Sequence, residues 1–292
     1  MLALLKTFWQ QAPGNAGEDS GENLLQLPKS ESGRQTGEHI SSSSDHHQHH
    51  HMAHMDPLLM TFFVLNDLKL GKTMPLYFPY VDPSKSLDLL PKEKADSIPF
   101  SPNSLPYLLQ FFSISQDSPQ AKAMEETLWT CQDDQSINVG KGETKYCATS
   151  LETLLGQANK ILRSDTGVQI LMTSHTSKTT KTTVTTDPVL QNYTIVGKPK
   201  EIAAPNIIAC HSMPYPYAVY YCHNPEGETK VFEVTLLGEI HGDRIDAVSV
   251  CHMDTSQWDP HHVSFSVLGV LPGSSEVCHF FPPGDNLLLL PY

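Results

Sequence analysis

The sequence has no long apolar run and no block of basic residues. Its longest apolar run near the C-terminus, Leu287–Leu290, is far shorter than the roughly 20 residues needed to cross a bilayer. The chain carries 32 acidic and 19 basic residues, a net charge of −13 at pH 7, so its surface repels a nucleic-acid backbone. We therefore expect no membrane span, and neither nucleic acid nor anionic membrane as a partner.

The six cysteines lack the Cys-x-x-Cys spacing that is typical of structural zinc sites. An even cysteine count without that spacing predicts disulfide bonds, which imply a secretory route. A signal peptide is not recognisable, because only Met1–Leu5 is apolar before Lys6. We therefore expect a truncated, alternatively started or processed chain. The sequon Asn192-Tyr193-Thr194 makes Asn192 a candidate glycosylation site of a secreted protein.

The chain divides by composition near Pro57. Residues 10–45 are rich in Gly, Ser, Glu and Gln and nearly free of branched or aromatic side chains, so residues 1–56 are predicted to form a disordered leader. The leader ends in a His-rich tract at 46–54, which either collects metal ions loosely or is a solvated tract or purification-tag remnant. Residues 57–292 form the predicted folded domain.

Within this domain, helix signals come first and strand signals follow. Short strands are expected at 61–65 and 76–78, and helices over 101–112, 118–129 and 149–162. The last helix begins at a capping box, Thr149-Ser150-Leu151-Glu152, and its predicted buried face is Leu151, Leu154, Leu155, Ala158, Ile161 and Leu162. Further on, Phe232, Val234 and Leu236 alternate with polar residues, as do Val263, Phe265 and Val267. The predicted fold class is α+β, with a helix-rich part (57–200) packed on a mostly antiparallel, disulfide-stapled β module (201–292).

The dipeptide Cys-His occurs four times in the β module. The pairs are separated by 10, 27 and 25 residues, at Cys210-His211, Cys222-His223, Cys251-His252 and Cys278-His279. Neighbouring side chains on a strand point to opposite faces, so each pair sends sulfur one way and imidazole the other. We therefore expect two disulfides on one face and four converging histidines on the other, with three disulfide connectivities open. Cys131 and Cys147 would by elimination pair with each other, a staple that stabilises by about 3 kcal/mol.

Four imidazoles without a thiolate indicate a metal site. Such ligands suit copper, zinc, iron or nickel, and an oxidising compartment favours Cu(II). The predicted ligands are therefore His211, His223, His252 and His279, with His241, His261 and His262 as candidates for a second site. The alternative is that these histidines cap strand ends and satisfy backbone groups. Tyr217 and Tyr221 share a strand face with His223, but core packing is the interpretation we favour for them.

These residues resemble the plant-specific BURP-domain family, whose signature is four Cys-His pairs at these intervals. The leader is similar to that of the seed- and embryo-associated branch near the unknown seed proteins. The resemblance is carried by Phe62-Phe63, Asp67-Leu68, Gly71-Lys72, the run Cys147 to Glu152, Met213-Pro214-Tyr215-Pro216-Tyr217, Cys251 to Ser256, and Cys278 to Pro282.

The resemblance implies a secreted plant protein of the cell wall, apoplast or storage vacuole, with a role in seed or cell-wall development or stress response. It also implies copper at His211, His223, His252 and His279, and cell-wall components or peptides as partners. Some members are autocatalytic peptide cyclases that use copper and dioxygen to crosslink a Trp or Tyr side chain of a core peptide. The only aromatic residues before the His tract, Phe8 and Trp9, do not match the known linear cores. We therefore rank copper binding above cyclase activity.

Overall fold

The computed structural model describes residues 62–78, 87–132, 144–176, 190–225, 227–240, 242–284 and 286–292. The predicted leader (1–56) and its His tract lie outside these ranges. The helices are α2 (Lys92–Ser97), α3 (Leu105–Phe111), α4 (Pro119–Gln132), α5 (Leu151–Leu162) and α6 (Val263–Leu268), with the 3-10 segments η2 (Leu65–Asp67) and η4 (Pro102–Ser104). Among the described residues, none of the helices is long and apolar enough to span a bilayer.

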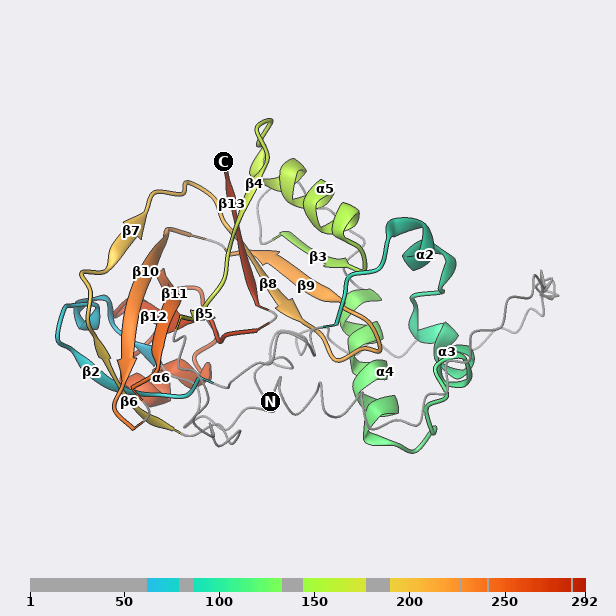
Figure 1. The fold of residues 1–292 in the computed structure, drawn as a ribbon, viewed down its shortest axis with the longest axis horizontal. Helices are drawn as coiled ribbons and strands as arrows, with labels where there is room; N and C mark the ends of the chain where they lie inside the picture. Colours follow the sequence, from blue (N-terminus) through green and yellow to red (C-terminus); the bar gives the residue numbers. More distant parts are fainter. Residues whose placement is uncertain are drawn as a thin grey trace.

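The strands form two antiparallel sheets (Figure 1). The first sheet has the order β1-β12-β11-β10-β6-β2, and β5 and β7 also pair with β11 and β10. Its strands are β1 (Phe62–Phe63), β2 (Thr73–Leu76), β5 (Ser174–His175), β6 (Gln191–Ile195), β7 (Lys200–Ile202), β10 (Thr229–Gly238), β11 (Arg244–His252) and β12 (Val277–Phe280). The second sheet has the order β3-β9-β8-β13-β4. Its strands are β3 (Thr144–Ala148), β4 (Val168–Leu171), β8 (Ile208–Ser212), β9 (Tyr220–Asn224) and β13 (Leu287–Pro291).

Helices and mostly antiparallel sheets, stapled by disulfides, are therefore confirmed. The predicted division into a helix-rich part and a separate β module is not. Strand β3 pairs with β9, and β2 pairs with β6 and so joins the sheet built on β10 and β11. Because antiparallel pairing joins segments far apart in sequence, residues on either side of position 200 share both sheets.

The two sheets pack against each other through an apolar layer. The second sheet contributes Ala209, Leu288 and Leu290, and the first contributes Val231, Val248 and Val250. Alternate residues of β13 belong to different cores, since Leu287 and Leu289 pack on the opposite side of the sheet. The strand Leu287–Leu290 is therefore buried on both faces, which explains its continuous apolar sequence.

Helix α5 covers the outer face of the second sheet through Leu154, Ala158 and Leu162 (Figure 1). Its N-cap is Ser150, whose hydroxyl accepts a hydrogen bond from the Thr153 N–H at 3.1 Å. The capping box predicts Thr149 as the N-cap, so the helix begins one residue later than predicted. Leu151 is 48% exposed, so its predicted place on the buried face is wrong.

The alternating segment Val263, Phe265 and Val267 is helix α6 instead of a strand. His262 caps this helix and Gly269 ends it with a left-handed backbone, φ 66°. Three apolar residues over so short a segment do not distinguish the two periods, and the caps determine the outcome. Phe265 is the buried member and packs with Phe62 and Val277 beside β1 and β12.

Helices α3 and α4 form a separate layer beside the second sheet (Figure 1). Leu108 and Met124 are fully buried there against Tyr215 and Val219. The segment that joins β8 to β9 thus packs on the helices, and its tyrosines are core residues.

Candidate metal centre

Three disulfides hold the described fold. They are Cys131–Cys147, Cys210–Cys222 and Cys251–Cys278, so all six cysteines of the chain are bonded. The first is the pair expected by elimination, and it ties α4 to β3. The other two each join directly opposite residues of neighbouring antiparallel strands, with Cα atoms 4.0 and 3.9 Å apart. Of the three connectivities that the sequence leaves open, the structure has the one that pairs Cys210 with Cys222 and Cys251 with Cys278.

The β8–β9 disulfide places two histidines on the other face of the second sheet. Cys210 lies opposite Cys222, so His211 and His223, each one residue further along its strand, are diagonal neighbours. The two disulfide sulfurs point to the core under α5, whereas the imidazoles share the face of Ala209, toward the first sheet. The Nε2 atoms of His211 and His223 are 3.4 Å apart. We call these two imidazoles the first half-site.

The β11–β12 disulfide repeats the arrangement in the first sheet. Cys251 lies opposite Cys278, and His252 and His279 follow on the opposite face. The ring centroids of His252 and His279 are 5.7 Å apart with planes inclined by 17°. The corresponding values for the first half-site are 5.5 Å and 23°. We call His252 and His279 the second half-site.

The side chain of Phe281 contacts one imidazole of each half-site. Its ring stacks on His211 at 5.8 Å and on His279 at 5.6 Å, with interplanar angles of 17° and 22°. Phe281 is 2% exposed, and its backbone N–H donates to the Val248 carbonyl. Successive ring contacts therefore connect the four predicted ligands, with the phenyl group of Phe281 between His211 and His279, and we call this series of rings the row. The row continues to Tyr221, 6.1 Å from His223, and to Trp258, 5.0 Å from His252.

Asn286 fixes the orientation of His211. Its Oδ1 atom is 3.1 Å from Nδ1 of His211 and can only accept, so Nδ1 carries the proton and donates. The lone pair of His211 then lies on Nε2, which faces His223. A histidine that binds a metal commonly donates its other N–H to a carbonyl in this way. Asn286 is 5% exposed, so this orientation is held inside the protein.

The environment of His279 favours its neutral form. Burial lowers its pKa from 6.5 to about 4, and the nearby His223 and His262 act in the same direction, whereas a hydrogen bond with the Phe280 backbone opposes the shift. The ring is only half-buried by accessible surface, but protein atoms crowd around it. A neutral imidazole is the form that coordinates a metal ion.

The residues fit two-imidazole sites better than one four-imidazole site. Two ligands on one ion, each bonded at about 2 Å, have nitrogens separated by about the distance observed in the first half-site. Within the described ranges, no group of three or more His, Cys, Asp or Glu side chains is placed to hold an ion. Each half-site therefore brings two imidazoles together.

The remaining candidate histidines have different roles. His262 caps α6 through Nδ1 and lies 4.8 Å from Trp258. His261 is exposed at the surface, and its backbone N–H donates to Asp259. His241 lies outside the described residues. Phe281, Trp258 and Asn286 were not predicted as site residues. Strand alternation after Cys278 could have indicated Phe281, but no local signal in the sequence marks Asn286.

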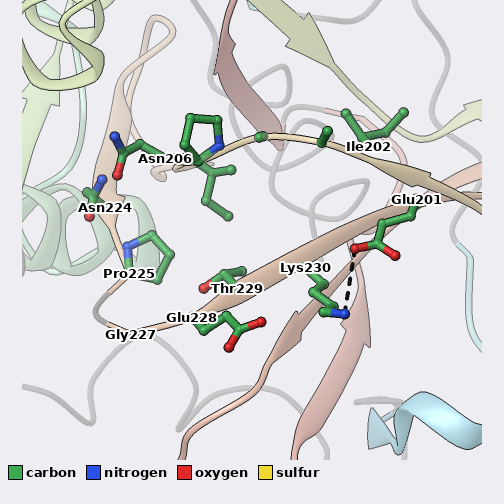
Figure 2. Close-up of a pocket in the computed structure, with 13 residues that line it drawn as sticks. Glu201, Ile202, Asn206, Asn224, Pro225, Gly227, Glu228, Thr229 and Lys230 are labelled. Carbon is green, nitrogen blue, oxygen red and sulfur yellow. Dashed lines mark ion pairs between the residues drawn. The ribbon is translucent and has the colours of Figure 1, made fainter.

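A cavity of about 280 Å³ lies between the two segments that cross from one sheet to the other (Figure 2). Its walls are formed by 201–207 and by the described part of 224–230. Two of the lining residues, Lys230 and Glu201, form an ion pair at 3.7 Å at one end of the cavity. Asn224 directly follows His223, and Thr229 lies opposite His252 in the sheet. The cavity is thus adjacent to both half-sites along the chain, although none of their histidines lines it.

Asn192 of the sequon is exposed on β6. Its side-chain amide donates to Glu239 at 2.8 Å. The site is accessible at the surface, and glycosylation there stays a prediction.

The architecture defines a class of antiparallel protein in which cross-strand disulfides and paired imidazoles occupy opposite faces of two sheets. The family model described as BURP domain matches residues 61–290. The chain therefore belongs to the BURP domain family.

Curated relatives agree with this assignment. The chain is 45% identical over 233 residues to BURP domain-containing protein BNM2A of Brassica napus, and the match covers 80% of each chain. It has the same identity and coverage with BURP domain protein USPL1 of Arabidopsis thaliana. It is 37% identical over 223 residues to Protein RAFTIN 1B of Triticum aestivum, covering 76% of this chain and 58% of the relative.

Proposed function

We propose that this protein binds copper at two sites, one formed by His211 and His223 and the other by His252 and His279. The observation that carries the proposal is the 3.4 Å distance between the Nε2 atoms of His211 and His223. The disulfide between Cys210 and Cys222 holds together the two strands that carry these histidines. The second half-site supports it with nearly the same ring geometry.

Copper is preferred to zinc because of the ligand set. All cysteines are oxidised, so thiolates are not available as ligands, and imidazole-only sites bind Cu(II) most strongly among the common divalent ions. Copper would supply one-electron redox chemistry. The protein would supply orientation, through Asn286 and Phe281, and at His279 an imidazole whose pKa is lowered by burial. The disulfides also support our proposal that the protein resides outside the cytosol, in the apoplast, cell wall or storage vacuole.

The test is copper titration of the full chain with the six histidines of the tract at 46–54 replaced by Gln, because that tract would bind copper by itself. We expect two copper ions per chain by metal analysis. His223→Ala and His252→Ala should each remove one ion, and the double variant should remove both. His261→Ala is the matched control and should bind like the parent chain, since His261 is exposed and outside the row. Unchanged binding in the double variant would overturn the proposal.

A second candidate function is oxidative crosslinking of a peptide with copper and dioxygen. It is favoured by one feature: each half-site has only two protein ligands, which leaves coordination positions for dioxygen or a substrate. Mass spectrometry of the copper-loaded chain in air, or of added Trp- and Tyr-containing peptides, tests this function. A loss of two hydrogens per crosslink that disappears in His223→Ala would make the protein an enzyme. Unchanged peptide masses would reject it.

A further inference from the structure

We propose that Trp258 is an oxidative modification site: with copper at His252 and His279, hydrogen peroxide adds one oxygen atom to its indole ring. The inference rests on the proposed function and concerns a residue that is not a ligand.

The position of Trp258 carries the argument. Its ring meets His252 edge to face, with centroids 5.0 Å apart, and leans on His262 at 4.8 Å. The segment before α6 is folded back by a hydrogen bond from the backbone N–H of Trp258 to the backbone carbonyl of Thr255, at 3.1 Å. The ring is half-buried, so peroxide can reach it but the ring cannot turn far from His252. An oxidant generated at the second half-site therefore meets this indole first.

Other oxidisable side chains near the half-sites are less well placed. Met253 follows His252, but it packs in the core that contains Cys251 and Cys278, on the opposite face of the sheet. Tyr221, beside the first half-site, lies 6.1 Å from His223. A phenol is also a poorer acceptor of an oxygen atom than an indole. Of these two described rings, the indole of Trp258 is thus both the more electron-rich and the closer to an imidazole.

The chemistry balances with peroxide as the oxidant. The O–O bond of hydrogen peroxide breaks, one oxygen atom forms a bond to an indole carbon, and the other leaves as water. The indole loses two electrons and the peroxide gains them. Copper held by His252 and His279 would supply one-electron redox chemistry for this cleavage, and the net reaction would leave the copper unchanged.

The chain contains its own control in Trp129. This residue belongs to α4, the helix that Figure 1 shows beside the second sheet. Trp129 is 55% exposed, more than the half-buried Trp258. An oxidant that diffuses freely in solvent would react with Trp129 at least as readily as with Trp258. An oxidant generated at the second half-site would react with Trp258 first.

The experiment uses the full chain with the Gln-substituted tract, loaded with copper, treated with dilute hydrogen peroxide and analysed by peptide mass spectrometry. We expect the gain of one oxygen atom to be several times more abundant at Trp258 than at Trp129. His252→Ala should abolish the preference, and His261→Ala should keep it. Loading with redox-inactive zinc in place of copper should also abolish it, which tests the site without a substitution.

Copper content is measured in the same samples, so that the two proposals fail separately. A chain that binds no copper at the half-sites overturns the proposed function and this inference with it. A chain that binds copper but gains oxygen equally at both tryptophans, or only at the histidines, overturns this inference alone.

Discussion

Asn286 holds His211 by a hydrogen bond of 3.1 Å, so a buried carboxamide on the approach to β13 decides which nitrogen of a β8 histidine faces His223. The contact joins residues 75 positions apart and lies beside the layer between the sheets.

We predict that Asn286→Leu weakens copper binding at the first half-site about 10- to 100-fold, the usual cost of losing a hydrogen bond that orients a ligand. The measurement is copper titration in a His252→Ala background, which leaves only the first half-site. Asn286→Asp keeps an oxygen acceptor and should bind more tightly than Asn286→Leu. Equal affinities of the Leu and Asp variants would show that the acceptor has no part in binding.

We predict that replacing Cys210 and Cys222 by Ala costs about 3 kcal/mol of unfolding free energy, the loop-entropy value for a short loop. The same change should remove copper from the first half-site, because the disulfide fixes the register that brings His211 beside His223. Urea unfolding and metal analysis measure the two effects.

The control for this prediction is the double Ala variant of Cys131 and Cys147. It breaks a loop of similar length, with a sequence separation of 16 against 12, but no histidine adjoins either cysteine. Its stability should fall by a comparable amount while both copper ions remain. Loss of copper in this control would mean that binding follows general stability.

We predict that Phe281→Ala destabilises the chain by about 3–5 kcal/mol, as expected for a large side chain deleted from a tightly packed interior. The removed ring also stacks on His211 and His279, so copper affinity should fall at both half-sites. Phe281→Leu keeps most of the volume and should cost less than about 1.5 kcal/mol. Denaturant unfolding and copper titration compare the parent chain with Phe281→Ala and Phe281→Leu. A loss of copper affinity at one half-site only would contradict the role of Phe281 at both.

Acid should destabilise the metal-free protein through His279. Its pKa is about 4 when folded against 6.5 in the unfolded chain, so the unfolded state binds more protons between these values. The contribution of His279 to stability is present above about pH 6.5 and falls by roughly 3 kcal/mol as the pH drops to 4. His279→Gln should flatten this part of the pH profile, whereas exposed His261→Ala should leave it unchanged. Parallel profiles of the parent and His279→Gln would exclude His279 as the cause.

Much of the candidate site follows from the sequence because it depends on local geometry. A Cys-His dipeptide on a strand must send its two side chains to opposite faces, and this holds at His211 and at His252. The pairing of the cysteines does not follow, because it is set by the register of strands that meet only in the folded chain. Asn286 and Trp258 were missed for the same reason: both reach the histidines from segments with no local signal.

The fold shows the same limit. The helix at 151–162 has both a cap and an amphipathic face, and it was predicted nearly to the residue. In the segment 263–268, three apolar residues alternate with other residues, which favours a strand. The segment is a helix, because His262 caps its N-terminus. The strand Thr144–Ala148 joins the second sheet by pairing with β9, which lies more than 70 residues away along the chain. Local strand propensity does not predict which distant strand will pair with it.

The geometry of a half-site does not depend on the length of chain between its strands. Only 10 residues separate the first two Cys-His pairs and 25 separate the last two, yet the ring separations differ by 0.2 Å, from 5.5 to 5.7 Å. A disulfide between opposite residues fixes the diagonal pair of imidazoles by itself. The connecting segments can therefore lengthen, shorten or change sequence without moving the imidazoles, which makes each cross-linked strand pair a transferable unit and leaves the loops free to diverge.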